Sequence, residues 1–463
     1  MALFSRSPRK DMDMLNGSLW DKLCLIAIPL ALTGVLQQLF NAADVAVLGR
    51  FVSSDAMAAV GTDVPVIGTI VSLCMGLALG ANVVVARSIG MKDLEAANRG
   101  VHTSFGVAVI LGAVIALLGE LLVPVLMGLL LVPEAVRGHA EAYLRVYLIG
   151  LPFIAVYNFL SAVYRSKGNT GVPLMALIAA TLFNVAGNVF FVLTTDWGAA
   201  GVALATVLSN LLAAGILFFR QLRTTGILQL VPSRLFAIDR DALRAMVRIG
   251  LPAGIQGMVF SLSNILVQSA INSLGPAAMA GSVAGMTIEI NVYCFINGFG
   301  LAATTFISQN YGARNFARCR RATWVSFWLN LAVTAVMVSI VILFARDLLR
   351  IFSDEEAVIA LGVARIWYVV LPEFISVVME TTSDAMRGYG YSLAPAMVTL
   401  VAICSVRVIW VLTVFPANPT FERLMTVYPV SWAVTAVLLV LLYMRHQRSL
   451  RAKEARLLEA AAA

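Results

Sequence analysis

The chain has 463 residues, of which 60% are hydrophobic and only 13% are charged. Soluble globular domains are about one quarter charged, so this composition excludes an ordinary soluble protein and indicates a protein embedded in the lipid bilayer. The formal net charge is +8. The basic residues gather in short segments between apolar stretches, so we expect no binding to nucleic acid.

Apolar segments of bilayer-spanning length follow one another along the chain. A membrane-crossing helix takes ~20 residues, and residues 172–195, 197–219, 325–345 and 424–444 carry no charge. The segments are too long for barrel strands and do not alternate apolar with polar residues, so we expect an all-helical integral membrane fold. The twelve predicted spans lie at about residues 23–49, 60–86, 100–122, 142–164, 172–195, 197–220, 249–272, 280–310, 322–345, 360–386, 391–415 and 424–444.

The second half of the chain repeats the first at an offset of about 222 residues. The matching positions include Gly76 with Gly298, Gly90 with Gly312, Gly168 with Gly390 and Arg165 with Arg387. Such a repeat predicts two pseudo-symmetric six-helix lobes with the working site at their interface. We expect a first lobe over residues 1–220, a cytoplasmic linker over 221–248, a second lobe over 249–445 and a cytoplasmic tail over 446–463.

The basic residues also predict an orientation. With the amino terminus in the cytoplasm, 25 of the 33 Lys and Arg residues fall in cytoplasmic segments, and seven, including Arg365, fall in outer loops. This asymmetry follows the positive-inside rule and predicts that both termini are cytoplasmic. We expect a multi-pass protein of the bacterial inner membrane, without a cleavable signal.

Motifs for catalysis and for tightly bound cofactors are missing from the sequence. It has no P-loop, no HExxH and no nucleophile elbow, and its five cysteines are not spaced for a disulfide framework or a metal site. We therefore expect a monomeric protein that is not an enzyme and needs no cofactor. Gly76 and Gly80 form a GxxxG pattern that we interpret as close helix packing.

Polar residues within the first-lobe spans are candidates for an ion site, because polar groups are costly in the bilayer. Gln37, Asn41 and Asp44 share one face of the first span at helical spacing. Asp44 is either a protonatable or cation-binding carboxylate or an interfacial residue near the outer end. Asn184 and Asn188, one turn apart in the fifth span, either ligate a cation or hydrogen-bond between helices. Asp63 and Glu120 lie near span ends and are interpreted as interfacial.

The second lobe carries more charged residues within its spans. Glu289 lies in the eighth span, Glu380 and Asp384 lie one turn apart in the tenth, and Arg407 lies in the eleventh. Two neighbouring carboxylates resist simultaneous ionisation, so this group could hold a proton, or Na⁺ at Glu289 and Glu380. The alternative is a buried ion pair with Arg407. Glu373 follows a proline near the outer end, and we expect it to be solvated.

Aromatic and methionine side chains within the spans are candidates for a substrate cavity. Stacked rings and thioethers suit flat apolar cations. The candidates are Phe40, Tyr157, Met258, Phe260, Tyr293 and Met379.

Several motifs together resemble the multidrug and toxic compound extrusion (MATE) family. They are Pro29-x7-Gln37-x6-Asp44, Gly250-Leu-Pro-x3-Gln256, Gln309-Asn-Tyr-Gly-Ala-Arg314, Met386-Arg-Gly-Tyr-Gly390 and Arg407-x2-Trp410. The resemblance covers roughly residues 15–445. It implies a V-shaped pair of lobes that alternates between inward and outward states and exports cationic or amphipathic compounds in exchange for H⁺ or Na⁺.

The same resemblance assigns roles to particular positions. Asp44 matches the acidic residue of the family's first span, and Asn188 stands where the fifth-span pattern has Asp. Phe260 and Ser376 stand where one bacterial branch has acidic residues, so a second-lobe ion site would have to use Glu289 and Glu380.

We therefore expect a cation-coupled antiporter that exports small organic molecules. One alternative is a lipid or lipid-linked oligosaccharide flippase of the same superfamily, whose cavity should be broadly basic. The span interiors here contain more acidic than basic residues, which favours cationic substrates. The other alternative, a membrane-embedded transferase, would need a catalytic cluster at a membrane face.

Overall fold

The computed structural model describes residues 12–130 and 132–462, and this part of the chain is helical without strands. The first half forms seven helices: α1 (Trp20–Phe51), α2 (Ser54–Gly90), α3 (Leu94–Leu129), α4 (Glu134–Ile149), α5 (Leu151–Ser166), α6 (Gly171–Thr194) and α7 (Gly198–Arg223). The second half forms α8 (Arg240–Asn272), α9 (Pro276–Gly312), α10 (Phe316–Leu343), α11 (Ala345–Arg350), α12 (Glu356–Arg365), α13 (Glu373–Gly388), α14 (Leu393–Ile409), α15 (Phe415–Ala417), α16 (Phe421–Met425) and α17 (Val427–Ala462).

The predicted all-helical membrane fold is confirmed. Ten helices of the described residues are long and apolar enough to cross a membrane, and two bent helix pairs bring the count to twelve. The bent pairs are Val136–Ile149 with Leu151–Ser166, at 47°, and Glu356–Val370 with Glu373–Gly388, at 41°. We had predicted unbroken spans at both places. The breaks fall beside Pro152 and Pro372, because proline lacks the backbone N–H that continues a helix.

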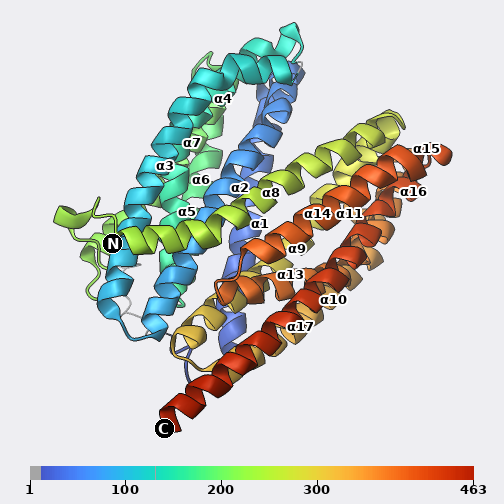
Figure 1. The fold of residues 1–463 in the computed structure, drawn as a ribbon. Coiled ribbons are helices and arrows are strands. Elements are labelled where there is room, and N and C mark those ends of the chain that lie inside the picture. The colour runs from blue at the N-terminus through green and yellow to red at the C-terminus, as the bar shows by residue number, and fades with distance from the viewer. Residues whose placement is uncertain (1–11, 131, 463) are drawn as a thin grey trace.

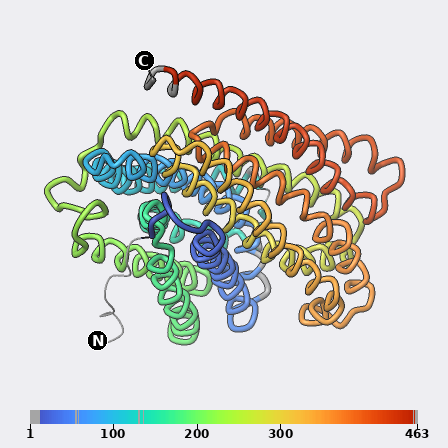
Figure 2. The backbone as a smooth tube through the Cα atoms, turned by 90° about the horizontal axis from the view of Figure 1, so that it is seen from below, coloured from blue at the N-terminus to red at the C-terminus, as the bar shows by residue number. Residues whose placement is uncertain are grey.

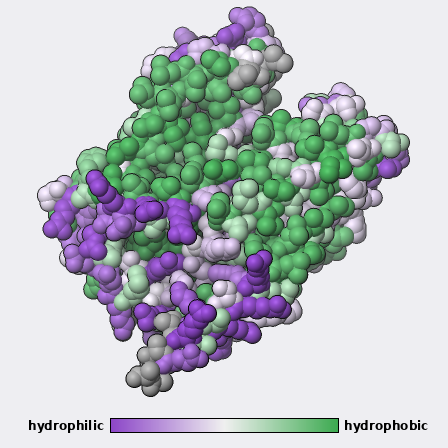
Figure 3. Space-filling model, in the orientation of Figure 1, coloured by the Kyte–Doolittle hydropathy of each residue, from purple (hydrophilic) through white to green (hydrophobic). Residues whose placement is uncertain are grey.

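The helices form two bundles arranged as a V (Figure 1). Helices α1–α7 make one lobe and α8–α17 the other, and α1 begins and α17 ends where the lobes meet (Figure 1). Seen from that end, the two halves of the chain lie side by side (Figure 2). Hydrophobic residues cover the flanks of both lobes, while hydrophilic residues gather at the joined end (Figure 3). This distribution suits a protein whose flanks face lipid.

The joined end of the V is built symmetrically from the two repeats. Helix α8 packs along α2, and α1 packs along α9. A Cβ atom at Gly76 of α2 would overlap the backbone of Gly254 of α8, and one at Gly90 would overlap the carbonyl of Gln309. Only glycine permits such a close approach of two backbones. The interpretation of the Gly76 pattern as a packing motif is therefore confirmed, and the packing joins the two lobes.

The contacts of α2 with α8 and of α1 with α9 form the seam between the lobes. Hydrogen bonds between the lobes reinforce this seam. The Arg87 Nη2 atom donates to the Tyr389 carbonyl at the end of α13 over 2.7 Å. Gln309, the repeat counterpart of Arg87, donates through Nε2 to the Ser166 carbonyl at the end of α5, also over 2.7 Å. Each lobe therefore caps a helix of the other, and both bonds must break before the joined end can open.

A methyl group introduced at the seam should destabilise this arrangement. Gly76→Ala forces α2 and α8 apart, and overpacking of this kind typically costs ~1–3 kcal/mol. Gly68→Ala, on the same helix, is the matched control, because a Cβ there meets nothing within 4 Å. Alanine is the better helix former, so Gly68→Ala should keep or slightly raise the unfolding temperature. Thermal unfolding of the detergent-solubilised proteins checks this, and equal unfolding temperatures would contradict the role of the seam.

Candidate functional site

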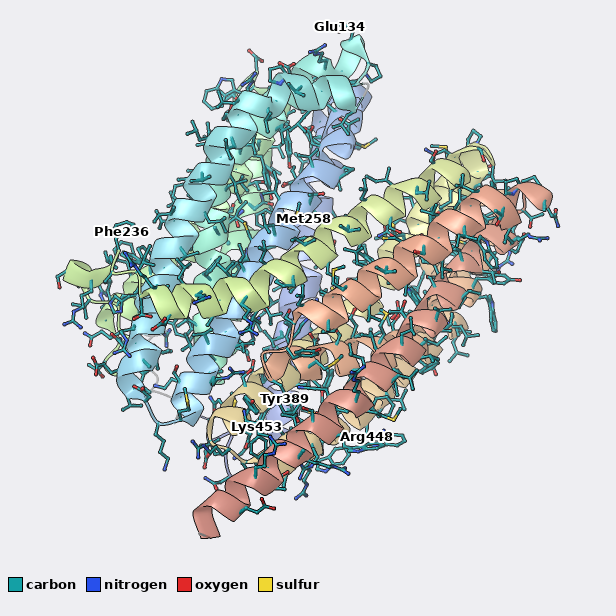
Figure 4. The ribbon with its side chains drawn as sticks, viewed as in Figure 1. Glu134, Phe236, Met258, Tyr389, Arg448 and Lys453 are labelled. Carbon is teal, nitrogen blue, oxygen red and sulfur yellow. The ribbon has the colours of Figure 1, made fainter. Side chains whose placement is uncertain are left out.

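A cavity of about 370 Å³ lies between the lobes. Helices α1, α2 and α5 line it from the first lobe, and α8, α9 and α13 line it from the second. Of the predicted lining residues, Tyr157, Phe260, Tyr293 and Met379 do line it. Phe40 is instead buried in packing around α1, and Met258 lies on α8 without lining the cavity (Figure 4).

The charged lining of this cavity differs from the expected excess of acidic residues. Arg165 of α5, Arg387 of α13 and Glu380 of α13 line it, so basic side chains outnumber carboxylates on its wall. The acidic residues counted in the spans lie largely elsewhere, because several are buried within a lobe. Neutral polar side chains, including Gln37 and Gln256, complete the wall.

Asp44 lies at the centre of a hydrogen-bond network inside the first lobe. Its side chain is buried, with 2% of its surface exposed. Its Oδ1 atom accepts a hydrogen bond from Asn188 Nδ2 over 2.6 Å, and its Oδ2 atom accepts one from the Thr206 hydroxyl over 2.7 Å. Asn184 Nδ2 donates to Thr206 Oγ1 over 3.1 Å. Asp44 is therefore buried inside the first lobe and not exposed at its surface.

The predicted polar stripe on the first span is only partly brought together. Gln37 faces the central cavity, and Asn41 is exposed. The stripe does not converge on one site, because the surroundings of this helix face differ at Gln37, Asn41 and Asp44. Thr206 of α7 was not predicted, since a single threonine in an apolar span carries no distinguishing pattern.

In the second lobe, the alternative of an ion pair between a carboxylate and Arg407 is wrong. Glu289 binds Arg365, with Arg365 Nη2 to Glu289 Oε2 at 2.8 Å. Arg407 donates instead to Asn264 Oδ1 over 2.6 Å. Arg365 was assigned to an outer loop, but it is buried, with 1% exposed. Arg365 ends α12, which forms one bent span together with α13.

Glu289 and Glu380 do not share a partner. Glu380 Oε1 accepts a hydrogen bond from the Tyr293 hydroxyl over 3.0 Å. Asp384 Oδ1 accepts one from Arg387 Nη1 over 2.7 Å. Within the described residues there is no group of three His, Cys, Asp or Glu side chains that could hold a metal ion. Glu289 and Glu380, which we predict could share a Na⁺ ion, thus have different hydrogen-bond partners in the structure.

Two carboxylates that we had placed at the membrane surface are buried. Glu373 is 1% exposed and Asp63 is 0% exposed. Glu373 begins α13 immediately after the break at Pro372. It therefore lies at the bend of the span formed by α12 and α13, and not at the outer end of that span. Glu120 fits the interfacial interpretation, because its side chain is 28% exposed and pairs with Arg145.

Comparison with known proteins identifies the family. The profile of the family described as MatE matches residues 29–190 and 252–412, one segment in each lobe. YoeA of Bacillus subtilis, a probable multidrug resistance protein, is 26% identical over 410 residues, or 87% of this chain and 89% of that protein. NorM of Thermotoga maritima, also a probable multidrug resistance protein, is 26% identical over 396 residues, covering 83% of each chain.

The fold is also that of a solved transporter. A MOP superfamily transporter from Pyrococcus furiosus superposes with a TM-score of 0.87 at 21% identity, over 96% of this chain and all of the other. The family consists of transporters, which confirms the expectation that the chain is not an enzyme and excludes the transferase. The two lobes, the cavity between them and the profile match over both repeats show that the chain belongs to the MatE family of multi-pass membrane transporters.

Proposed function

We propose that the protein is a cation-coupled antiporter that exports amphipathic small molecules by alternating access across a bacterial inner membrane. The observation that carries this proposal is the environment of Asp44. Its hydrogen-bond partners, Asn188 and Thr206, are neutral. No ion pair with Asp44 occurs in the described part of the chain. A buried carboxylate without a counter-charge is costly in the bilayer, so binding of a proton or Na⁺ there is favourable.

The composition of this network suits either cation. Hard cations prefer carboxylate, carbonyl and hydroxyl oxygens, and Asp44, Asn184, Asn188 and Thr206 supply these. The Asn188 Oδ1 atom is buried without a hydrogen-bond partner, so rotation of this amide would turn an additional oxygen toward the carboxylate. A proton on Asp44 would instead form an O–H group that donates to the Asn188 Oδ1 atom after the same rotation.

The other predicted coupling residues receive different roles in this proposal. Arg365 neutralises Glu289 and Arg387 neutralises Asp384, so we assign both carboxylates to structural ion pairs. Arg407 supports the packing of the second lobe. Glu380 faces the cavity, where it contacts the substrate path and not the ion at Asp44. Coupling then rests on the first lobe.

The V shape corresponds to one state of the transport cycle. With cytoplasmic termini, the joined end faces the cytoplasm and the cavity opens outward. Ion binding at Asp44 must favour one state and substrate the other, because a ligand shifts a conformational equilibrium only by binding the two states unequally. Helix α1 carries Asp44 and also lines the cavity and packs against α9 at the seam, so it connects the ion site to the cavity and to the seam.

Asp44→Asn should abolish ion-driven transport while the folded protein remains in the membrane. The amide keeps the shape of the side chain but removes the charge that a cation would neutralise. Dye efflux from proteoliposomes, measured separately under an H⁺ and a Na⁺ gradient, checks this and identifies the ion. Asp196→Asn is the control, because Asp196 is an exposed carboxylate in the loop between α6 and α7. Wild-type efflux by Asp44→Asn would refute coupling at this site.

Thr206→Val should weaken the same network. Valine has the shape of threonine but no hydroxyl, so Asp44 Oδ2 loses its donor, and an unpaired buried acceptor costs about 1–3 kcal/mol. Thr206→Ser keeps the hydroxyl and should stay near wild type. The midpoint of ion-driven transport and the unfolding temperature both test this pair. Equal behaviour of the two variants would show that the hydroxyl contributes nothing.

Both termini should be cytoplasmic, as the distribution of basic residues predicts. Reporter proteins fused to the carboxyl terminus, one active only in the cytoplasm and one only outside it, measure the side directly. Activity of the cytoplasmic reporter alone is the expected result. Activity of the external reporter would reverse the orientation and make the described state inward-open.

A further inference from the structure

Two arginines related by the internal repeat face the central cavity from opposite lobes. Arg165 lies in the last turn of α5 and Arg387 in the last turn of α13. Each stands three residues before a glycine with positive φ, Gly168 at 79° and Gly390 at 80°. Both side chains line the cavity. The repeat therefore places two like charges at one end of the space where a substrate would bind.

The two arginines differ in how they are compensated. Arg387 donates to Asp384 Oδ1 over 2.7 Å and to Gln256 Oε1 over 2.8 Å. The Arg165 side chain has neither an ion pair nor a hydrogen bond to any residue within 12–130 and 132–462, and its Nε atom is buried without an acceptor. Asp384 attracts Arg165 electrostatically but is bonded to Arg387. One guanidinium therefore faces the cavity without a bonded counter-charge.

The position of Arg165 at a helix end does not by itself explain an unpaired guanidinium in the cavity wall. A cation in the last turn is favoured by the helix dipole, but that effect contributes at most ~2 kcal/mol even in a partly buried geometry. The equivalent end of α13 has an arginine with both a carboxylate and an amide partner. Charge-assisted hydrogen bonds from a planar guanidinium suit a carboxylate, sulfonate or phosphate group. A ligand with a carboxylate, sulfonate or phosphate group would therefore supply the acceptor that the Arg165 side chain lacks.

The remainder of the cavity wall suits an apolar or aromatic body attached to that group. Tyr157 lies two turns before Arg165 on the same helix, and Phe260, Tyr293 and Met379 line the cavity from the second lobe. A cavity of about 370 Å³ falls within the usual range for small-molecule sites. Glu380 also lines the wall, but its Oε1 atom already accepts from Tyr293.

We propose that this cavity binds amphipathic organic anions, with the anionic group at Arg165 and the neighbouring Arg387 and the apolar body against Tyr157 and Phe260. The proposal rests on the transport function proposed above and specifies its substrate class. Because the arginines belong to different lobes, an anion that contacts both is held while the ends of α5 and α13 lie together. The anion would therefore favour the state in which the seam is closed.

A matched pair of ligands tests the class of substrate. Naphthalene-2-sulfonate and 1-methylquinolinium have fused rings of similar size and opposite charge. Equilibrium dialysis of the radiolabelled compounds against wild-type protein in nanodiscs of zwitterionic lipid measures both affinities without any ion gradient. We expect tighter binding of the sulfonate. Tighter binding of the quinolinium would overturn the proposal, and this comparison requires no variant to fold.

Substitution then assigns the contact to one residue. Arg165→Gln should lower sulfonate affinity about tenfold or more, as expected for loss of a charge-assisted contact, and leave quinolinium binding unchanged or stronger. Arg165→Lys keeps the charge and should lose less. Arg223→Gln is the matched control, because Arg223 ends α7, is exposed and does not line the cavity. Wild-type sulfonate affinity in a folded Arg165→Gln protein would refute the contact.

Two further measurements distinguish this proposal from lipid binding at Arg165 and from the proposed ion coupling. Addition of phosphatidylglycerol to the nanodiscs should not displace the sulfonate; displacement would assign Arg165 to a lipid headgroup and overturn a small-molecule substrate. Proteoliposome transport of both compounds under H⁺ and Na⁺ gradients separates coupling from recognition. Ion-driven transport of quinolinium but not sulfonate would refute the anion proposal alone. Sulfonate binding without ion-driven transport would refute the antiporter alone.

Discussion

The bilayer core offers no water to a polar group, and this constraint decides both the helices and the position of every charge within them. Backbone groups are satisfied within each span, which leaves the side chains as the variable element. Two pairs of charges inside the second lobe are bonded to each other: Glu289 with Arg365 and Asp384 with Arg387. Asp44, Asp63, Glu373 and Arg165 have no ion pair within the described residues. Among these, Asp44 lies in a network of neutral oxygen-bearing side chains and Arg165 lines the cavity, so these two are where we expect a mobile ion or a ligand to contribute most.

The joined end of the V is stabilised by close backbone contact and by hydrogen bonds through which each lobe caps a helix of the other. Small residues allow α2 to approach α8, and Arg87 and Gln309 each reach a helix end of the opposite lobe. These contacts are specific to the closed arrangement, so they stabilise one state without a covalent link between the lobes. A transporter needs such contacts to be weak enough to exchange, and individual hydrogen bonds between membrane helices contribute only ~0.6 kcal/mol on average.

The proposed ion site at Asp44 and the cavity have different lining residues but share α1. Asp44 lies on α1 within the first lobe, while Leu30, Gly34 and Gln37 of the same helix line the cavity. A Cβ at Gly34 would meet the Cys294 side chain of α9, so α1 is also packed tightly against the second lobe. A change in the position of α1 would therefore affect the cation, the substrate and the seam together. This arrangement provides the physical connection that coupling requires.

Local chain properties were sufficient to predict the fold. Segment length and hydropathy indicated the spans, the 222-residue offset indicated two lobes, and helical spacing placed Asn184 and Asn188 on one face. The site was predicted less completely, because its partners are distant in sequence. Asn188 and Thr206 lie 144 and 162 residues from Asp44, and Arg365 lies 76 residues from Glu289.

Spacing within one helix cannot show which side chain of another helix will stand opposite, so the sequence named Asp44 but not Thr206. The alternative that Arg407 pairs with a carboxylate of the second lobe was also wrong, because Arg407 donates to Asn264. Glu373 and Arg365 flank the break at Pro372 within one bent span and are buried, whereas the sequence pattern placed both near the outer surface. The sequence by itself determined the helices, the two lobes and the acidic residue of the first span. Only the tertiary structure decided the ion pairs and the basic cavity wall, because both depend on how separate helices face one another.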